Sequence, residues 1–159
     1  MTKIHLIEQK QFTKAKEITD KVDILSSSLL IAQTKNWIDN KEFNKFNQIF
    51  SCKNETDILS EFFFLISNIY SSEDEIGKSN FYLKISSFLN PKFHFNLSLF
   101  VENYYNSENY RKTEKVLESF SGSDDLYYWY KIKIKTQIIS QELGQEQAYN
   151  FINSKFKKI

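Results

Sequence analysis

The feature of this sequence that most constrains its fold is a pattern of large and small residues that recurs about every 34 positions. Shifting residues 60–93 by 34 onto residues 94–127 places large residues on large ones and small residues on small ones. A further forward shift of 35, and backward shifts of 33 and then 31, continue the pattern. The positions that correspond in this way include Leu6, Trp37, Tyr70, Tyr104 and Ile139. A period of this length predicts a repeated unit of two secondary-structure elements that buries its apolar face against its neighbours.

Within one unit, the spacing of the apolar residues predicts two helices. Phe63, Ile66 and Tyr70 are three and four residues apart, as on one face of a helix. After the polar break SSEDE at residues 71–75, residues 76–86 show the same spacing. The sequence therefore predicts an all-α protein whose unit is helix, turn, helix.

Helix-breaking and acidic residues indicate where the helices of residues 60–93 end and begin. Pro91 is the only proline of the chain, and because proline cannot continue a helix we expect it to end this unit. Glu73, Asp74 and Glu75 precede the second predicted helix, where negative charge is favourable at the positive end of the helix dipole. We interpret this acidic cluster as a surface turn rather than a metal site.

With these positions in place, residues 60–93 resemble a tetratricopeptide repeat, a 34-residue pattern of paired helices with a terminal proline. The resemblance implies an α-solenoid of antiparallel helix pairs that forms a right-handed superhelix. It extends over nearly the whole chain as one domain, with units at about 1–24, 25–54, 60–93, 94–127 and 128–159. The sequence departs from the family pattern at Phe46, which replaces a small residue, and at Gln33 and Lys135, which replace apolar ones.

Residues 127–139, YYWYKIKIKTQII, give the strongest signal against an all-helical fold. Lysine and isoleucine alternate through residues 131–135, a pattern that taken alone favours a β-strand. Leu126, Trp129, Ile132 and Thr136 nevertheless form a helical stripe in the register of the repeat. We therefore predict a helix here.

Composition and motifs favour a binding protein over an enzyme. A net charge of +1 argues against a nucleic-acid binder, and Cys52, the single cysteine, has no zinc-ligand pattern around it. His5 and His94 are not arranged with residues that suggest catalysis, and the sequence has neither a glycine-rich phosphate loop nor a run long enough to span a bilayer. We expect no enzymatic activity, no cofactor, no metal, no nucleic-acid partner and no membrane span.

The resemblance implies that a peptide or protein segment binds the concave surface formed by the first helix of each pair. Asn68 fits a clamp for a C-terminal carboxylate, but Leu99 and Ile134 do not, so we do not expect that kind of binding. The first helices otherwise present aromatic residues with few charges, and we expect several of these rings to be open to solvent, whereas Trp37, Tyr70 and Tyr104 are expected to be buried. The candidate peptide-binding residues are Phe64, Asn68, Phe95, Glu102, Tyr105, Tyr130 and Lys133.

Other readings stay open at this point. The chain could be a regulatory or docking segment of a larger enzyme or of a secretion or envelope assembly, and a helical enzyme with an unrecognised site is a third reading. Because residue 1 falls inside a unit under the backward shift of 31, we expect a fragment of a longer array with a short first helix. The chain as given predicts a cytoplasmic protein, and a periplasmic one if a signal precedes Met1.

Overall fold

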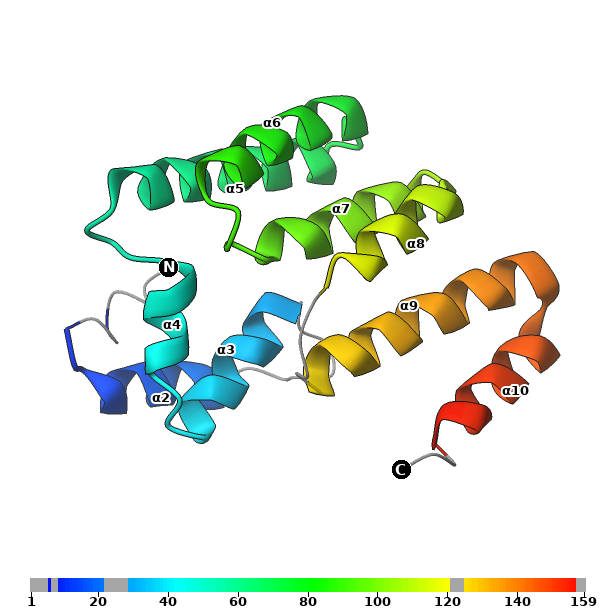
Figure 1. Cartoon of the computed structure of the whole chain (residues 1–159), viewed down its shortest axis with the longest axis horizontal. Coiled ribbons are helices and arrows are strands. Elements are labelled where there is room, and N and C mark those ends of the chain that lie inside the picture. The colour runs from blue at the N-terminus through cyan, green and yellow to red at the C-terminus, as the bar shows by residue number, and fades with distance from the viewer. Residues whose placement is uncertain (1–5, 7–8, 22–28, 121–124, 157–159) are drawn as a thin grey trace.

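The computed structural model describes residues 6, 9–21, 29–120 and 125–156, and all regular secondary structure in these ranges is helical. Figure 1 shows the helices as they follow one another along the chain. Their bounds are α2 Phe12–Asp20, α3 Leu29–Asp39, α4 Asn44–Ile49, α5 Glu55–Ser72, α6 Ile76–Leu89, α7 Phe95–Asn106, α8 Tyr110–Glu118, α9 Asp125–Leu143 and α10 Gln145–Phe156. The expected all-α fold is therefore confirmed.

Residues 127–139 lie entirely within α9, so the helical interpretation of this segment is confirmed. The side of α9 that packs into the protein includes Tyr127, Ile134 and Ile138, which are buried in one apolar cluster with Val101 and Leu117 of α7 and α8. Burial of this side outweighs the local preference of alternating isoleucine and lysine for a strand. Tertiary packing thus decides the structure of this segment.

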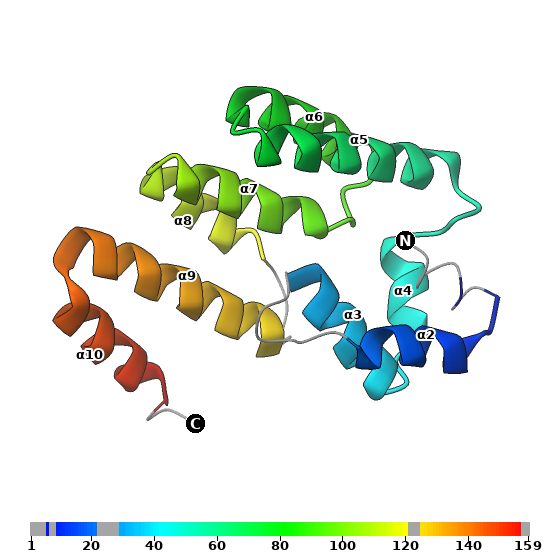
Figure 2. The same ribbon diagram turned by 180° about the vertical axis from the view of Figure 1, so that it is seen from behind.

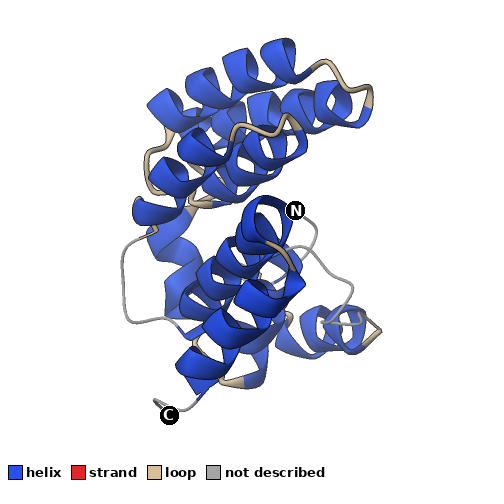
Figure 3. Cartoon of the chain, turned by 90° about the vertical axis from the view of Figure 1, so that its right-hand side faces the viewer, coloured by secondary structure: helices blue, strands red, loops and turns tan. Residues whose placement is uncertain are grey.

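Consecutive helices pack as hairpins: α5 against α6, α7 against α8, and α9 against α10. Figures 1 and 2 show the α5–α6 hairpin at one end of the molecule, the α7–α8 hairpin beside it, and α9 with α10 at the other end. In the amino-terminal part, α2 packs against α3, and α3 in turn packs against α7 and α9. Figure 3 shows how the helices lie in layers when the molecule is seen from the side.

The turns between helices repeat one backbone geometry along the chain. Lys10, Lys41, Asp74 and Glu108 all have φ between 56° and 60°, in the left-handed region that non-glycine residues rarely adopt. They are 31, 33 and 34 residues apart, which are the shifts of the sequence repeat. Gly144, with φ of 97°, lies at the turn between α9 and α10.

Each of these four turns is closed by the same hydrogen bond, from the backbone N–H that follows the left-handed residue to the carbonyl five residues earlier. The four bonds are Gln11 to Leu6 at 2.8 Å, Glu42 to Trp37 at 2.8 Å, Glu75 to Tyr70 at 2.9 Å and Asn109 to Tyr104 at 2.8 Å. This is the bond that ends a helix in a Schellman motif. The acceptors are the residues that the sequence repeat places at one corresponding position.

Burial in the second expected helix of each predicted unit follows the same register. At the corresponding position near the start of these helices, the buried residues are Ala15, Phe46, Ser79, Thr113 and Ala148. Phe46 replaces a small residue here, and its ring meets Trp37 edge to face with the centroids 5.1 Å apart. The larger ring is thus accommodated in the amino-terminal cluster rather than at a close helix contact.

In the first helices the expected burial is only partly correct. Trp37 is buried, whereas Tyr70 and Tyr104 remain partly exposed. Lys78 and Lys112 lie over these two rings, with their ammonium nitrogens 5.5 Å and 5.4 Å from the ring centroids. A tyrosine at the edge of a helix pair can pack one face of its ring and keep its hydroxyl in water, which explains the partial exposure.

Pro91 lies in the loop between α6 and α7, as expected, because α6 ends at Leu89. Gln33, the polar residue at an apolar position of the repeat, is buried and accepts a 2.7 Å hydrogen bond from the hydroxyl of Tyr127. This bond connects α3 to α9.

The expected short first helix falls on residues 1–10, most of which lie outside the described residues. None of the described helices combines the length and apolar character needed to cross a membrane.

Candidate functional site

The seven candidate peptide-binding residues lie on α5, α7 and α9, and all of them except Asn68 fall into two groups. Phe64 and Phe95 belong to an apolar cluster around Phe93, at the start of α7. The remaining group lies on α7 and α9 and contains Glu102, Tyr105, Tyr130 and Lys133. Asn68 is exposed on α5, where its side-chain N–H donates a 2.8 Å hydrogen bond to the carbonyl of Phe64.

Phe95 corrects the expectation of an open aromatic surface, because only 3% of this residue is exposed. Its ring meets that of Phe93 edge to face with the centroids 5.1 Å apart, and Phe93 makes the same kind of contact with Phe64 at 5.4 Å. The loop after α6 folds Phe93 between the two candidate rings. Phe95 therefore stabilises the fold, and only Phe64 keeps partial exposure.

In the second group, Glu102 of α7 lies near enough to Tyr130 and Lys133 of α9 for their charges to influence one another, while the ring of Tyr105 lies 5.7 Å from that of Tyr110 on α8. Removal of water by the surrounding helices raises the pKa of Glu102, and the nearby positive charge of Lys133 opposes this shift. Burial, together with the negative charge of Glu102, raises the pKa of Tyr130 well above its usual range. The Tyr130 hydroxyl lies 3.5 Å from the carbonyl oxygen of Ser98, a long hydrogen bond. The Tyr130 phenol therefore holds its proton more firmly than an exposed tyrosine does.

These four side chains offer groups that can recognise a ligand. They are a carboxylate, an ammonium group and two phenols. Within the described ranges no three histidine, cysteine, aspartate or glutamate side chains are placed to hold a metal ion. Tyrosine is enriched at protein-binding surfaces, so the two phenol rings are the part of this group that favours binding of a protein.

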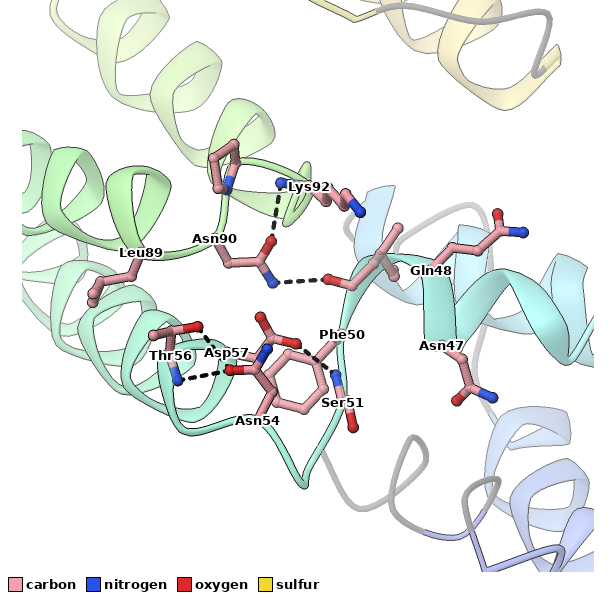
Figure 4. A pocket seen from close by; sticks show the side chains of 12 residues that line it. Asn47, Gln48, Phe50, Ser51, Asn54, Thr56, Asp57, Leu89, Asn90 and Lys92 are labelled. Atoms are coloured by element: carbon pink, nitrogen blue, oxygen red, sulfur yellow. Dashed lines mark hydrogen bonds between the residues drawn. The ribbon is translucent and has the colours of Figure 1, made fainter.

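A polar cavity of about 400 Å³ lies where the α4–α5 connection meets the α6–α7 loop (Figure 4). Asn90 joins the two segments, donating a 2.9 Å hydrogen bond to the carbonyl of Ile49 and accepting one of 3.0 Å from the N–H of Lys92. Asp57 accepts a 2.9 Å bond from the N–H of Ser51. Because these polar side chains form hydrogen bonds with backbone atoms of the cavity wall, we interpret their role as structural: they hold the two segments together.

Sequence reasoning missed this cavity and also the exposed apolar residues of α5. The cavity depends on the approach of two connections 40 residues apart, for which the repeat contains no signal. The α5 residues did carry a signal, because Ile58, Phe62, Leu65 and Ile69 have helical spacing of their own. They form a second apolar face on α5. The first apolar face, which contains Phe63, Ile66 and Tyr70, is the one that matches the repeat.

Comparison of the chain with protein-family models, with curated protein sequences and with solved structures finds no match.

Proposed function

We propose that this chain is a protein-interaction module, an α-solenoid of the tetratricopeptide kind that binds a peptide or protein segment and catalyses no reaction. The recurring left-handed turns, at Lys10, Lys41, Asp74 and Glu108, support the repeat architecture. They are spaced as the sequence repeat is and share the same hydrogen bond, which at Lys41, Asp74 and Glu108 follows the end of α3, α5 and α7. The pairing of α5 with α6, α7 with α8 and α9 with α10 is consistent with the antiparallel units of such a solenoid.

The observation that carries the proposed binding function is the group on α7 and α9. Two helices from different pairs contribute Glu102 and Tyr105 on one side, and Tyr130 and Lys133 on the other. Glu102 and Lys133 are both exposed, so a bound segment can contact either charge. A segment lying across the two helices would place apolar or aromatic side chains against the tyrosines and polar groups against the charged pair.

The experiment selects ligands for the immobilised protein from a random peptide library, and measures the affinity of each selected peptide for variants. Lys133→Glu should weaken binding at least about tenfold, equivalent to about 1.4 kcal/mol, because it removes the positive charge and adds a negative one beside Glu102. The matched control is Lys115→Glu, the same charge reversal at an exposed position of α8. Circular dichroism shows whether each variant keeps its helical structure.

Two results would contradict the proposal. One is a library selection that yields no peptide able to bind the protein in solution. The other is a set of peptides whose affinity changes equally with Lys133→Glu and Lys115→Glu, because such peptides would respond to total charge rather than to the α7–α9 group.

A further inference from the structure

Helix α5 carries a row of apolar residues on the side that faces water. Ile58, Phe62, Leu65 and Ile69 are 45 to 57% exposed, and their spacing of four, three and four residues places them in one stripe along the helix. Helices that bury one side normally expose polar residues on the other. We call these four residues the α5 stripe.

The interior of the α5–α6 hairpin contains small polar residues beside the fully buried Leu83. Ser60 and Ser86 are fully buried and bond to each other, with the Ser60 hydroxyl 2.9 Å from the Ser86 carbonyl and the Ser86 hydroxyl 2.6 Å from the Ser60 carbonyl. Ser67 is also fully buried, and its hydroxyl donates to the carbonyl of Phe63 at 2.8 Å. These serines are hydrogen-bonded within the hairpin, and the Ser86 hydroxyl also lies 3.0 Å from the side-chain oxygen of Asn96 on α7. The exposed α5 stripe is not part of these contacts.

Ring contacts extend the α5 stripe across the hairpin to α6. Phe62 meets Phe63 with centroids 5.6 Å apart, Phe63 stacks on Tyr82 at 6.0 Å, and Tyr82 meets Phe81 at 5.3 Å. Phe81, at the far end of this series, is 59% exposed. The stripe with Leu59 and Phe81 leaves on the order of 500 Å² of apolar surface in water, near the upper end for a monomer and most of the roughly 800 Å² that each partner buries in a stable interface.

The position of this patch and the charges around it indicate whether a lipid surface or a protein surface covers it. The α5–α6 hairpin lies at the edge of the molecule, beside the α7–α8 hairpin (Figures 1 and 3), and the α5 stripe on it is exposed. Acidic residues stand at both ends of α5, at Glu55, Asp57 and Glu73, and they disfavour an anionic lipid surface, which basic residues would attract. A protein surface is the occupant that fits.

The α5 stripe is self-complementary under a two-fold axis. Ile58 and Ile69 are equally far from the point midway between residues 63 and 64, and so are Phe62 and Leu65. Two α5 helices packed antiparallel about that point would place Ile58 against Ile69, and Phe62 against Leu65, of the second copy. The four, three, four spacing suits packing of two helices at a shallow angle. We propose that this face is a homodimer interface, in which the α5 helices of two copies of the chain pack antiparallel.

The first test measures the mass of the purified chain by sedimentation and by light scattering over a range of concentrations. We expect twice the mass of one chain, falling to one chain for Phe62→Glu, with the helical circular-dichroism signal unchanged because this side chain is exposed. Tyr149→Glu is the matched control, an exposed aromatic residue of α10 changed in the same way, and it should remain dimeric. A chain that stays monomeric at every concentration, or a dimer that survives Phe62→Glu, overturns the proposal.

The second test determines the arrangement of the two helices by disulfide cross-linking in a Cys52→Ser background. A mixture of Ile58→Cys and Ile69→Cys chains should give the mixed dimer under mild oxidation. Ile58→Cys alone should not cross-link, because the two cysteines would lie about 16 Å apart along antiparallel helices. Efficient cross-linking of Ile58→Cys to itself would overturn the antiparallel arrangement.

Discussion

The left-handed residues of the turns predict that glycine substitution will stabilise this protein. Lys41, Asp74 and Glu108 have φ of 58°, 60° and 56°, a region in which the Cβ atom crowds the following carbonyl oxygen. Glycine lacks this atom, and the chain already uses it at Gly144, where φ is 97°. The perturbation is therefore Lys41→Gly, Asp74→Gly and Glu108→Gly, singly and together.

The expected magnitude follows from two opposing effects. Relief of left-handed strain is worth roughly 1–2 kcal/mol per residue, whereas the extra freedom of glycine in the unfolded chain costs about 0.5–1 kcal/mol. Each substitution should thus raise the free energy of unfolding by about 0.5–1 kcal/mol, and the three, at separate turns, should add to about 1.5–3 kcal/mol. For a chain of this length each kcal/mol corresponds to an increase in Tm of about 2–4 °C.

Urea unfolding followed by circular dichroism measures these changes, and a matched pair of variants isolates the effect of φ. Glu114→Gly makes the same chemical change as Glu108→Gly, but within α8, where it should lower the free energy of unfolding by about 1 kcal/mol. The reciprocal change, Gly144→Ala, should also destabilise. If Glu108→Gly and Glu114→Gly destabilise by equal amounts, the left-handed turn does not carry the strain that the geometry implies.

Two further predictions concern buried polar groups. Burial raises the pKa of Glu61 above its usual 4.5, and one of its buried carboxylate oxygens has no hydrogen-bond partner. A raised pKa means that the folded state holds the proton more tightly than the unfolded state, so stability falls as pH rises through this range. Glu61→Gln should therefore stabilise the protein at pH 7 and have no such effect at pH 3, as thermal unfolding at the two pH values will show. Asn103→Ala should lower the free energy of unfolding by about 2–4 kcal/mol in urea, because the Asn103 amide donates to Ser79 at 2.8 Å and to Asn80 at 2.9 Å and accepts from Ser71 at 2.7 Å; a loss below 0.5 kcal/mol, used here as about the limit of a surface substitution, would contradict this role.

The helix pairs could be predicted from the sequence because the signal is repeated. A single weak stripe such as Leu97, Phe100 and Tyr104 would leave its boundaries open, but the same spacing one period earlier and later fixes which residues correspond. Pro91 and the acidic residues 73–75 then mark where helices end and begin. The alternation within residues 131–135 favours a strand, but the repeat register of the whole chain favours a helix. The register decides because it rests on many more residues than these five.

The candidate site was harder to predict because contacts between units do not repeat. The register assigns Phe95 to an open surface, and nothing in the repeat indicates that the α6–α7 loop folds Phe93 against it. Likewise, the hydrogen bond from Tyr127 to Gln33 joins residues 94 positions apart. It explains why a glutamine is buried at a position where the repeat pattern predicts an apolar residue. Periodicity therefore predicts which face of a helix is apolar but not which neighbour it meets.

The α5–α6 hairpin is a second case in which periodicity does not predict the neighbour of an apolar face. The residues of α5 that match the repeat, such as Ser67, lie inside, where small size allows two helices to approach and hydroxyl bonds replace apolar packing. Phe63 and Phe64 of the same helix pack against Tyr82 and Phe93. The residues of the α5 stripe remain exposed, and they can be buried only by something beyond the hairpin. Because a stripe symmetric about its own centre is complementary to itself, association of two copies buries it without any further chain. Added salt should strengthen this association, since antiparallel packing brings Glu55 of one copy near Glu73 of the other and screening weakens their repulsion. An interface built on salt bridges would respond in the opposite direction, so sedimentation at low and high salt separates the two.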